Sequence, residues 1–377
     1  MRFLLLFSST LLWAFSLISQ DALALEIDAK QAILKDAETG QILFQKNQTE
    51  QMPTSSMSKV MTMYMVFDAL EQGKITLDTE FKVSEKAWKK GGSKMFVEVD
   101  KNVKVEDLIR GVIIQSGNDA TIVLAEGLAG SENSFARQMT EKAKELGMKN
   151  SNFTNASGWP DANHYSTAED LAILGSRMIE DFPQYYKYYA ETEFEFNSIK
   201  QPNRNPLLYR NIGADGIKTG HTEVGGYGLI GTAKQNNRRV IMVINGLESG
   251  KARADTGSRL IEWGLNNFEN KTLFSKGNEV AGAKVIMGEK ELVPMKLNDD
   301  IHLTLPKSDQ DQIKFSVHYQ SPLQAPVSQG EEIGTLKIII PEREPLKVPL
   351  FAANDVEPVG FFKRILINAK LFLKSVI

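Results

Sequence analysis

Residues 53–70 read PTSSMSKVMTMYMVFDAL. The apolar residues of this stretch are dense enough for a buried helix that begins after Pro53 and ends near Gly73. Proline is favoured in the first turn of a helix, and glycine is favoured just past the last turn. Ser56 and Lys59 stand at the entrance of this helix, three residues apart. Their side chains therefore share one helix face, and the lysine amine can reach the serine hydroxyl.

Outward from this helix, strand and helix patterns are mixed along the chain, and the strands come as antiparallel pairs. We expect helices at 107–114, 119–128, 135–146, 168–179 and 259–268, and strands at 32–35, 41–44, 226–232 and 239–245. A glycine-containing turn joins the first strand pair, and a polar turn at 234–238 joins the second. This arrangement predicts a domain of the α/β class, more narrowly α+β.

Beyond about Lys271 the pattern changes to short strands separated by turn residues. These strands are expected at 279–287, 291–295, 301–305, 313–319, 335–340 and 346–351. Regular spacing of this kind predicts a small all-β module.

The first 24 residues have the layout of a signal peptide. Arg2 precedes an apolar run from Phe3 to Ile18, and the small-residue triplet Ala22-Leu23-Ala24 follows, so we expect cleavage after Ala24. The alternative is an uncleaved anchor helix, for which the apolar run is short compared with a span of about 20 residues. With either outcome, the remainder of the chain is exported.

The C-terminal residues 361–377 have the pattern of an amphipathic helix. Its apolar face contains Phe361, Phe362, Ile365, Ala369, Phe372, Leu373 and Val376. Four cations lie mostly on the other face, and each would cost a few kcal/mol at the centre of a bilayer. A helix lying along an anionic membrane surface therefore fits better than a membrane span. The pattern leaves open a helix docked on the protein's own surface.

The composition excludes several classes of function. The chain has 377 residues, with 44 Lys and Arg against 47 Asp and Glu and a formal charge of −3, as in an ordinary soluble protein of about two domains. Such a balance gives no overall attraction for nucleic acid. The absence of cysteine excludes a thiolate nucleophile, cysteine-ligated zinc and disulfides. With four histidines and no HExxH pair, a zinc hydrolase is not expected.

Three short motifs point to nucleophilic catalysis by a serine. A serine hydroxyl needs a neighbouring base, which Lys59 can supply to Ser56, and the free N–H groups of a helix N-terminus favour the negative charge that develops there. The second motif is Ser116-Gly117-Asn118 and the third is Lys218-Thr219-Gly220. Each motif alone is weak, since Ser131-Glu132-Asn133 also matches the second pattern. All three motifs in this order are expected by chance much less often than any one of them alone.

In combination, the three motifs resemble those of penicillin-binding proteins and serine β-lactamases. The sequence segments around the second and third motifs, at 115–120 and 215–222, are similar to those of the D-alanyl-D-alanine carboxypeptidases, the low-molecular-mass penicillin-binding proteins. The resemblance covers about residues 26–270. It implies a penicillin-binding-protein/β-lactamase-like domain with an antiparallel sheet and helices, followed by a small all-β domain and an amphipathic anchor. The expected division is 1–24 for the signal peptide, 25–270 for the catalytic domain, 271–352 for the β domain and 357–377 for the anchor helix.

The resemblance implies a serine acyl-transfer mechanism with three catalytic residues. Ser56 attacks the carbonyl between two terminal D-alanines while Lys59 takes its proton. Lys59 must then be neutral part of the time, which burial and the positive charge of Lys218 would promote. Ser116 relays a proton to the departing D-alanine amine. Water then hydrolyses the acyl-enzyme.

The same resemblance implies a set of binding residues. Asn118 orients the substrate amide and Lys59, and the backbone N–H groups of Ser56 and His221 form the oxyanion hole. Lys218 and Thr219 hold the substrate's terminal carboxylate by charge and hydrogen bond. The implied substrate-binding residues are Asn118, Lys218, Thr219, Gly220, His221 and Arg253, the last because it resembles a family arginine near the carboxylate pocket.

The resemblance also implies partners and a location. The substrate is a peptidoglycan stem peptide ending in D-Ala-D-Ala, β-lactam antibiotics are covalent inhibitors, and no metal or organic cofactor is needed. The expected location is the periplasmic face of a bacterial inner membrane, with the C-terminal helix on the membrane surface and no nucleic acid involved.

Two alternatives and one departure from the family pattern accompany this interpretation. A β-lactamase would need a glutamate-activated water, and residues 193–197 superficially resemble the glutamate loop of class A enzymes. Their position close before Lys218 argues against such a loop, and their alternating pattern instead predicts a strand. The second alternative is a non-catalytic protein that binds cell-wall peptide. The departure is Ser157, which stands where some carboxypeptidases have a histidine.

Overall fold

A computed structural model describes residues 25–341 and 343–376. The expected signal peptide at 1–24 lies outside the described residues.

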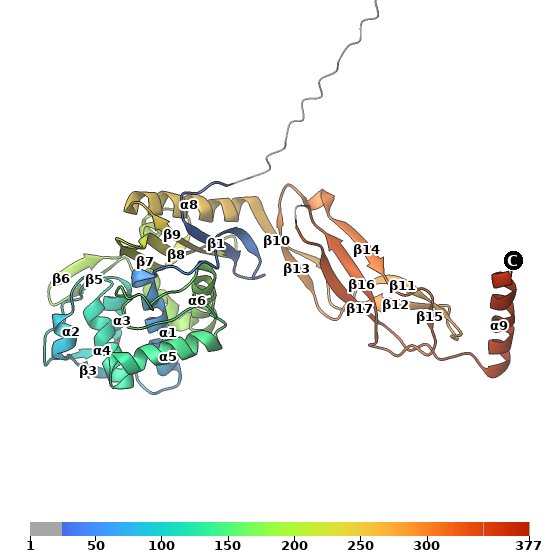
Figure 1. Cartoon of the computed structure of the whole chain (residues 1–377), viewed down its shortest axis with the longest axis horizontal. Helices are drawn as coiled ribbons and strands as arrows, with labels where there is room; N and C mark the ends of the chain where they lie inside the picture. The colour runs from blue at the N-terminus through green and yellow to red at the C-terminus, as the bar shows by residue number, and fades with distance from the viewer. Residues whose placement is uncertain (1–24, 342, 377) are drawn as a thin grey trace, which may run out of the picture.

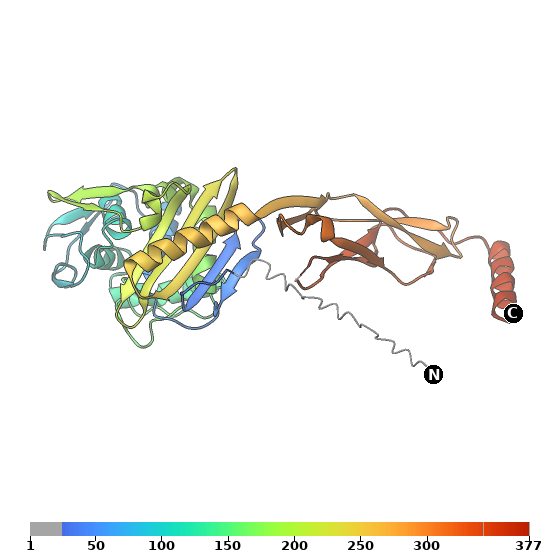
Figure 2. The same ribbon diagram turned by 90° about the horizontal axis from the view of Figure 1, so that it is seen from above.

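The N-terminal half is built on one five-stranded antiparallel sheet. Its strand order is β2-β1-β9-β8-β7, and the long helix α8 lies across one face (Figure 2). Because α6 covers the other face, the middle of β9 is buried on both sides, and its sequence is continuously apolar rather than alternating. The strands are β1 (Gln31–Asp36), β2 (Ile42–Lys46), β7 (Ala214–Thr222), β8 (Gly226–Gln235) and β9 (Arg238–Leu247).

The helices of this half pack around α1, which is buried on nearly all sides, as its dense apolar sequence predicts. A short 3-10 turn, η1 (Ser55–Ser58), leads into it. The helices are α1 (Lys59–Glu71), α2 (Glu85–Lys89), α3 (Val105–Ile113), α4 (Asn118–Ala129), α5 (Glu132–Glu145), α6 (Ala168–Asp181), α7 (Pro183–Tyr186) and α8 (Gly250–Asn267). Two further 3-10 turns are η2 (Lys187–Ala190) and η3 (Pro206–Tyr209).

Two small hairpins complete this half. They pair β3 (Glu80–Lys82) with β4 (Asn102–Lys104), and β5 (Glu193–Phe196) with β6 (Ile199–Pro202). β5 confirms the strand predicted at 193–197. Its glutamates are exposed, and Phe194 and Phe196 pack against the core.

A separate β-rich part follows α8 and has a core of its own (Figure 1). It contains a two-stranded sheet, β10-β13, and a six-stranded sheet in the order β14-β16-β17-β12-β11-β15. Its strands are β10 (Phe268–Phe274), β11 (Glu279–Ile286), β12 (Leu292–Lys296), β13 (Ile301–Pro306), β14 (Lys314–His318), β15 (Leu323–Gln324), β16 (Glu332–Ile339) and β17 (Leu346–Ala352), with a 3-10 turn η4 (Gln310–Gln312). The six strands predicted beyond Lys271 are all present.

The final helix, α9 (Phe361–Val376), lies beyond the β-rich part, at the opposite end of the molecule from the five-stranded sheet (Figure 1). Its first turns leave large apolar side chains exposed, with Phe362 82% and Leu366 71% accessible. Among the helices in the described ranges, none combines the length and the apolar character that crossing a membrane requires.

The structure extends several elements beyond the sequence predictions. α8 begins at Gly250 rather than at residue 259, because the Ser249 side chain caps it by accepting a hydrogen bond from the Ala252 N–H. It ends at Asn267, so Phe268 begins strand β10 instead of closing the helix. Strand β7 has little strand propensity in its glycine-rich sequence and is held by its pairing with β8.

Candidate active site

Ser56 and Lys59 meet where the 3-10 turn η1 becomes helix α1. The Lys59 Nζ lies 2.9 Å from the Ser56 Oγ. Lys59 is completely buried, whereas Ser56 keeps partial access to solvent. Ser55 has φ +50°, a left-handed conformation that is strained for a residue with a side chain. The turn that presents the hydroxyl is therefore held by its surroundings.

The hydrogen bonds of Lys59 show which group can exchange a proton with it. Its Nζ also donates to the Asn118 Oδ1 at 2.7 Å and to the Ser157 carbonyl oxygen at 2.7 Å. These two oxygens only accept hydrogen bonds, so they hold two N–H groups of the amine in either charge state. The third partner, the Ser56 hydroxyl, can also donate. A neutral Lys59 therefore turns its lone pair toward Ser56 and can accept the hydroxyl proton.

The surroundings of Lys59 favour its neutral form. Burial is the main cause, and with the positive charge of Arg204 it lowers the pKa of Lys59 from 10.5 to about 7, against an opposing effect of Asp119. Burial also holds the pKa of Lys218 well below its usual value, with the charge of Lys59 as the next cause. The charge of Lys59 thus disfavours the charged form of Lys218, whereas the positive charge that acts most on Lys59 is that of Arg204 rather than the expected Lys218.

The second motif lies in a tightly fixed loop at the start of α4. Ser116 is buried with φ +58°, and Asn118 donates from its Nδ2 to the Gly91 carbonyl at 2.9 Å. The Asp119 carboxylate accepts hydrogen bonds from the N–H groups of Met95 and Phe96, both at 2.9 Å. These bonds join the segment around Gly91 to the loop, so that Asn118 can hold Lys59 in one position.

The third motif lies on β7, against the turn that carries Ser56. Lys218 and Thr219 are buried, and the Lys218 Nζ donates to the Thr219 carbonyl at 3.3 Å. A Cβ atom on Gly220 would stand 2.9 Å from the Thr54 carbonyl, so only glycine allows this close approach. The Ser55 hydroxyl also bonds to the Thr222 hydroxyl at 3.1 Å.

His221 and Arg253 flank the outer end of β7. The His221 side chain is exposed, and its ring lies 3.9 Å from the Tyr227 ring, centroid to centroid. One Arg253 nitrogen lies 3.4 Å from the Gly220 carbonyl oxygen, and the guanidinium stands over the Tyr227 ring at 5.5 Å. Burial lowers the pKa of Arg253. Tyr227 thus holds both predicted residues beside the third motif.

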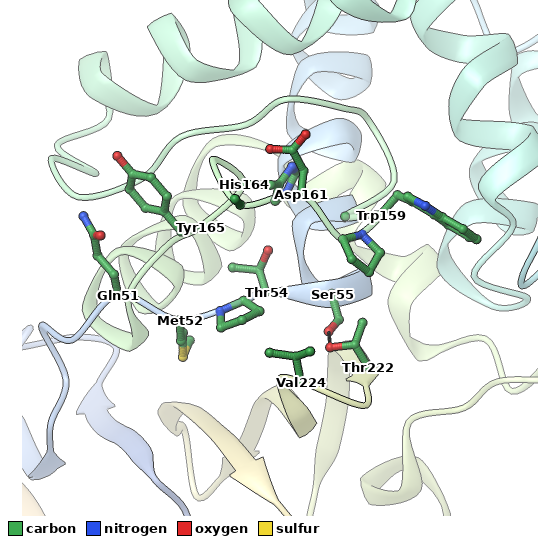
Figure 3. Close-up of a pocket in the computed structure, with 14 residues that line it drawn as sticks. Gln51, Met52, Thr54, Ser55, Trp159, Asp161, His164, Tyr165, Thr222 and Val224 are labelled. Carbon is green, nitrogen blue, oxygen red and sulfur yellow. Dashed lines mark hydrogen bonds between the residues drawn. The ribbon is translucent and has the colours of Figure 1, made fainter.

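Two cavities adjoin at Ser55, next to the proposed nucleophile. The first, the catalytic cavity, measures about 570 Å³ and is lined by Ser56, Asn118, Ser157, His221 and their neighbours. The second measures about 540 Å³ and lies between residues 51–55, 158–165 and the end of β7 (Figure 3). Both linings include Ser55, Gly158, Trp159, Pro160, Thr222 and Val224, so the cavities share a wall.

Sequence reasoning missed four contributors to this site. The Ser157 carbonyl and the space beside Gly158, where a Cβ would stand 1.7 Å from the Ser55 carbonyl, involve the backbone. A backbone contact leaves no signal in a single sequence, whereas Gly158 could have suggested a close approach of two backbone segments. His164 lies 2.7 Å from the Ser58 hydroxyl, and Arg204 acts on the pKa of both buried lysines. Neither residue stands in a motif.

The arrangement can perform acyl transfer. It provides a hydroxyl nucleophile, an amine base of matched pKa, and the basic side chains of Lys218 and Arg253 at one end for a carboxylate. In the described parts of the chain, no group of His, Asp and Glu side chains is placed to hold a metal ion.

Comparisons with known proteins agree with this chemistry. A family model described as D-alanyl-D-alanine carboxypeptidase matches residues 18–249, and one for the C-terminal domain of penicillin-binding protein 5 matches residues 268–358. The D-alanyl-D-alanine carboxypeptidase DacA of Haemophilus influenzae is 38% identical over 346 residues, which cover 90% of this chain and 88% of that protein. DacC of Escherichia coli is 37% identical over 371 residues, covering 96% and 92%.

Solved structures of similar proteins have the same fold. The D-alanyl-D-alanine carboxypeptidase DacD from Francisella tularensis matches with a TM-score of 0.82 and 30% identity, over 89% of this chain and 95% of that chain. Penicillin-binding protein D2 from Listeria monocytogenes, in its ampicillin-bound form, matches with a TM-score of 0.59 and 29% identity, over 64% and 99%.

Proposed function

The chain belongs to the D-alanyl-D-alanine carboxypeptidase family of serine peptidases, and we propose that Ser56 is the nucleophile with which it removes the terminal D-alanine from peptidoglycan stem peptides. The observation that carries this assignment is the contact of Lys59 with Ser56 at 2.9 Å, made by a lysine whose pKa is lowered to about 7. At neutral pH such an amine is close to half neutral, as a general base requires.

In the proposed acylation step, the Ser56 oxygen bonds to the carbonyl carbon between the two D-alanines and its proton moves to Lys59. The backbone N–H groups of Ser56 and His221 stabilise the oxyanion. The bond from that carbon to the nitrogen of the terminal D-alanine then breaks, and the proton passes through Ser116 to the leaving amine. Water hydrolyses the resulting ester and returns a proton to Ser56.

The terminal carboxylate is assigned to the third motif. Lys218 and Thr219 hold it on β7, and Arg253 adds a second cation at the outer side of Gly220. A bound carboxylate would compensate the burial of Lys218, which in the free enzyme disfavours its charged form. This arrangement explains why the enzyme acts on a peptide with a free carboxyl end.

β-Lactams are proposed to acylate the same serine. A similar protein, penicillin-binding protein D2 of Listeria monocytogenes, has an ampicillin-bound crystal form. The strand β5 occupies the segment that superficially resembled a class A glutamate loop, and its glutamates are exposed. We therefore expect β-lactams to be slowly released inhibitors of this enzyme rather than substrates.

The proposed location of the enzyme depends on three parts of the chain. Residues 1–24 direct export to the periplasm, residues 25–270 form the catalytic domain, and the β domain at 271–352 joins it to the C-terminal helix. The helix is proposed to lie on the inner membrane surface. Phe361, Phe362 and Leu366 are exposed on α9 rather than packed on the β domain, which supports lipid as their partner.

Product analysis tests the assignment. Wild-type enzyme incubated with a stem pentapeptide ending in D-Ala-D-Ala should release free D-alanine, measured by mass spectrometry. Ser56→Ala should abolish both this release and labelling by a fluorescent penicillin. Ser131→Ala, in the chance Ser-x-Asn match on the surface, should retain both. Unchanged labelling of Ser56→Ala would exclude the proposed nucleophile.

A further inference from the structure

A loop of residues 152–165 packs against helix α1 beside the active site. Two backbone hydrogen bonds, at 2.9 and 3.0 Å, join its two ends. The loop covers one face of α1, where the Thr62 hydroxyl donates to the Ala156 carbonyl at 2.6 Å. It also supplies the Ser157 carbonyl oxygen that accepts a hydrogen bond from Lys59. The position of this loop therefore affects both the burial and the orientation of the proposed base.

His164 lies where this loop closes, in contact with the turn that carries Ser56. The residue is buried, with 5% of its surface accessible. Its Nδ1 atom accepts a hydrogen bond from the Thr154 backbone N–H at 3.2 Å. Because a backbone N–H can only donate, Nδ1 carries no proton, and the neutral ring holds its proton on Nε2. The Nε2–H group therefore donates to the Ser58 hydroxyl oxygen, which lies 2.7 Å away.

The hydrogen bond of the ring continues into the nucleophile turn. Because the Ser58 oxygen accepts from the ring, its own proton is donated to the Thr54 hydroxyl oxygen at 2.5 Å. Thr54 and Ser58 stand two residues before and two residues after Ser56, and both are fully buried. Figure 3 shows Thr54 below His164. The hydrogen bonds through the imidazole thus connect the loop to both sides of the nucleophile.

The surroundings of His164 keep its ring neutral. Burial lowers the pKa of His164 from 6.5 to about 4, against the opposing charge of Asp161 and with a smaller contribution from the positive charge of Lys59. At pH 5.5 and above, the ring is therefore almost entirely neutral. A charged ring would carry a proton on Nδ1, where it would oppose the Thr154 N–H. The direction of both hydrogen bonds is thus fixed over the pH range in which Lys59 titrates.

We propose that His164 is a positioning residue, which holds the loop against the nucleophile turn and thereby keeps Lys59 buried and oriented. This inference rests on the proposed function, in which Lys59 takes the proton of Ser56. The imidazole suits this role because a single rigid ring offers one acceptor and one donor. It can therefore join the backbone of the loop to a hydroxyl of the turn at a fixed separation.

Loss of the imidazole should affect Lys59 in two ways. When the loop moves away, the Ser157 carbonyl no longer holds one N–H of the amine, so the lone pair points toward Ser56 for a smaller part of the time. Water also reaches the amine, and burial is the main cause of the low pKa of Lys59. The acylation rate constant at its high-pH plateau should therefore fall, and the midpoint of its pH profile should move to higher pH.

Acylation by a fluorescent penicillin, followed by stopped flow from pH 5.5 to 9, tests this role. His164→Leu removes both hydrogen bonds and should lower the plateau rate constant by about tenfold or more, since a displacement of about 1 Å can cost up to about 100-fold. Its midpoint should move to higher pH. His164→Gln, whose amide nitrogen can donate to the Ser58 hydroxyl, should recover most of the lost rate. His318→Leu, at an exposed histidine of the β-rich part, should change neither quantity.

Ser58→Ala tests the same connection from the side of the turn. It removes the hydroxyl that links the ring to Thr54, so the plateau should fall and the midpoint should move as in His164→Leu. In the double variant His164→Leu/Ser58→Ala the two effects should not add, because either substitution alone already breaks the connection. Fully additive effects would overturn it. Because Ser58→Ala removes a single oxygen atom, it carries the test even where His164→Leu gives no folded protein.

The rate constant separates positioning from a purely structural role. A loss of folded enzyme lowers the amplitude of the labelling and leaves its rate constant and midpoint unchanged. A wild-type plateau and midpoint in both His164→Leu and Ser58→Ala would therefore overturn the proposal, whatever their amplitudes, and so would a His164→Gln variant as slow as His164→Leu. A failure of the proposed function is distinguishable, because Ser56→Ala would then be labelled like the wild type.

Discussion

The rate at which penicillin acylates Ser56 should follow the titration of Lys59. Burial lowers the pKa of Lys59 from 10.5 to about 7. At about 1.36 kcal/mol per unit, this shift corresponds to about 5 kcal/mol by which the site disfavours the ammonium form. A group with a pKa of 7 is about 10% neutral at pH 6, half neutral at pH 7 and about 90% neutral at pH 8. The acylation rate constant should therefore rise about fivefold from pH 6 to 7 and about twofold from pH 7 to 8.

Stopped-flow measurement with a fluorescent penicillin, from pH 5.5 to 9, gives this profile directly. Replacement of Arg204 by glutamine removes a positive charge that lowers the pKa of Lys59, so it should move the midpoint to higher pH and leave the plateau in place. Lys90→Gln is the matched control, because Lys90 acts in the same direction but ranks last among the causes of the shift. Its profile should move less.

Two results would refute this account of the base. A rate that increases tenfold per pH unit up to pH 9 would show that Lys59 titrates like a solvated lysine. A rate independent of pH between 5.5 and 9 would show that proton transfer to Lys59 does not limit acylation.

Three further predictions concern stability and attachment. Burial lowers the pKa of His164 from 6.5 to about 4, so the folded state resists protonation of this side chain. The free energy of unfolding should therefore be highest above pH 6.5 and decrease by up to about 3 kcal/mol as the pH falls to 4. Urea unfolding should show this decrease in the wild type and a smaller one in His164→Gln. Arg238→Met leaves the buried Asp36 without the cation that now lies 2.7 Å away and should cost about 3 kcal/mol in the same assay, whereas Arg177→Met, from a half-exposed pair, should cost less than about 1 kcal/mol. Deletion of residues 361–377 should abolish cosedimentation with anionic vesicles at moderate salt, and full retention would contradict the proposed membrane helix.

The sequence was sufficient where side chains carry the signal. The dense apolar pattern after Pro53 predicted the buried helix α1. The alternation of polar and apolar residues at 193–197 predicted strand β5, although the same residues resemble a glutamate loop. The family interpretation from three motifs was also confirmed by the relatives. These predictions succeeded because periodicity and motif spacing reflect burial and chemistry that the side chains themselves perform.

Other parts of the site depend on backbone contacts between distant segments. The Ser157 carbonyl holds Lys59 at 2.7 Å, and any side chain at 157 would leave that oxygen in place. The departure from the histidine of some carboxypeptidases therefore does not touch this contact, since the Ser157 hydroxyl bonds to the Asn155 side chain instead. Similarly, β7 is a strand because β8 pairs with it and because Gly220 lets it approach Thr54. A single sequence does not reveal such pairings.

Substrate binding should change the charge of Lys218 and leave Lys59 able to act as the base. In the free enzyme, burial and the charge of Lys59 keep the pKa of Lys218 low. A substrate carboxylate beside Lys218 favours the charged form of that amine. The Lys218 ammonium and the carboxylate then act on Lys59 with opposite signs, so together they change its pKa less than either charge would alone. The base therefore remains available when a ligand with a carboxylate occupies the site. On this reasoning, the acid limb at saturating peptide, which reports the complex, should lie close to the limb at low peptide concentration, which reports the free enzyme.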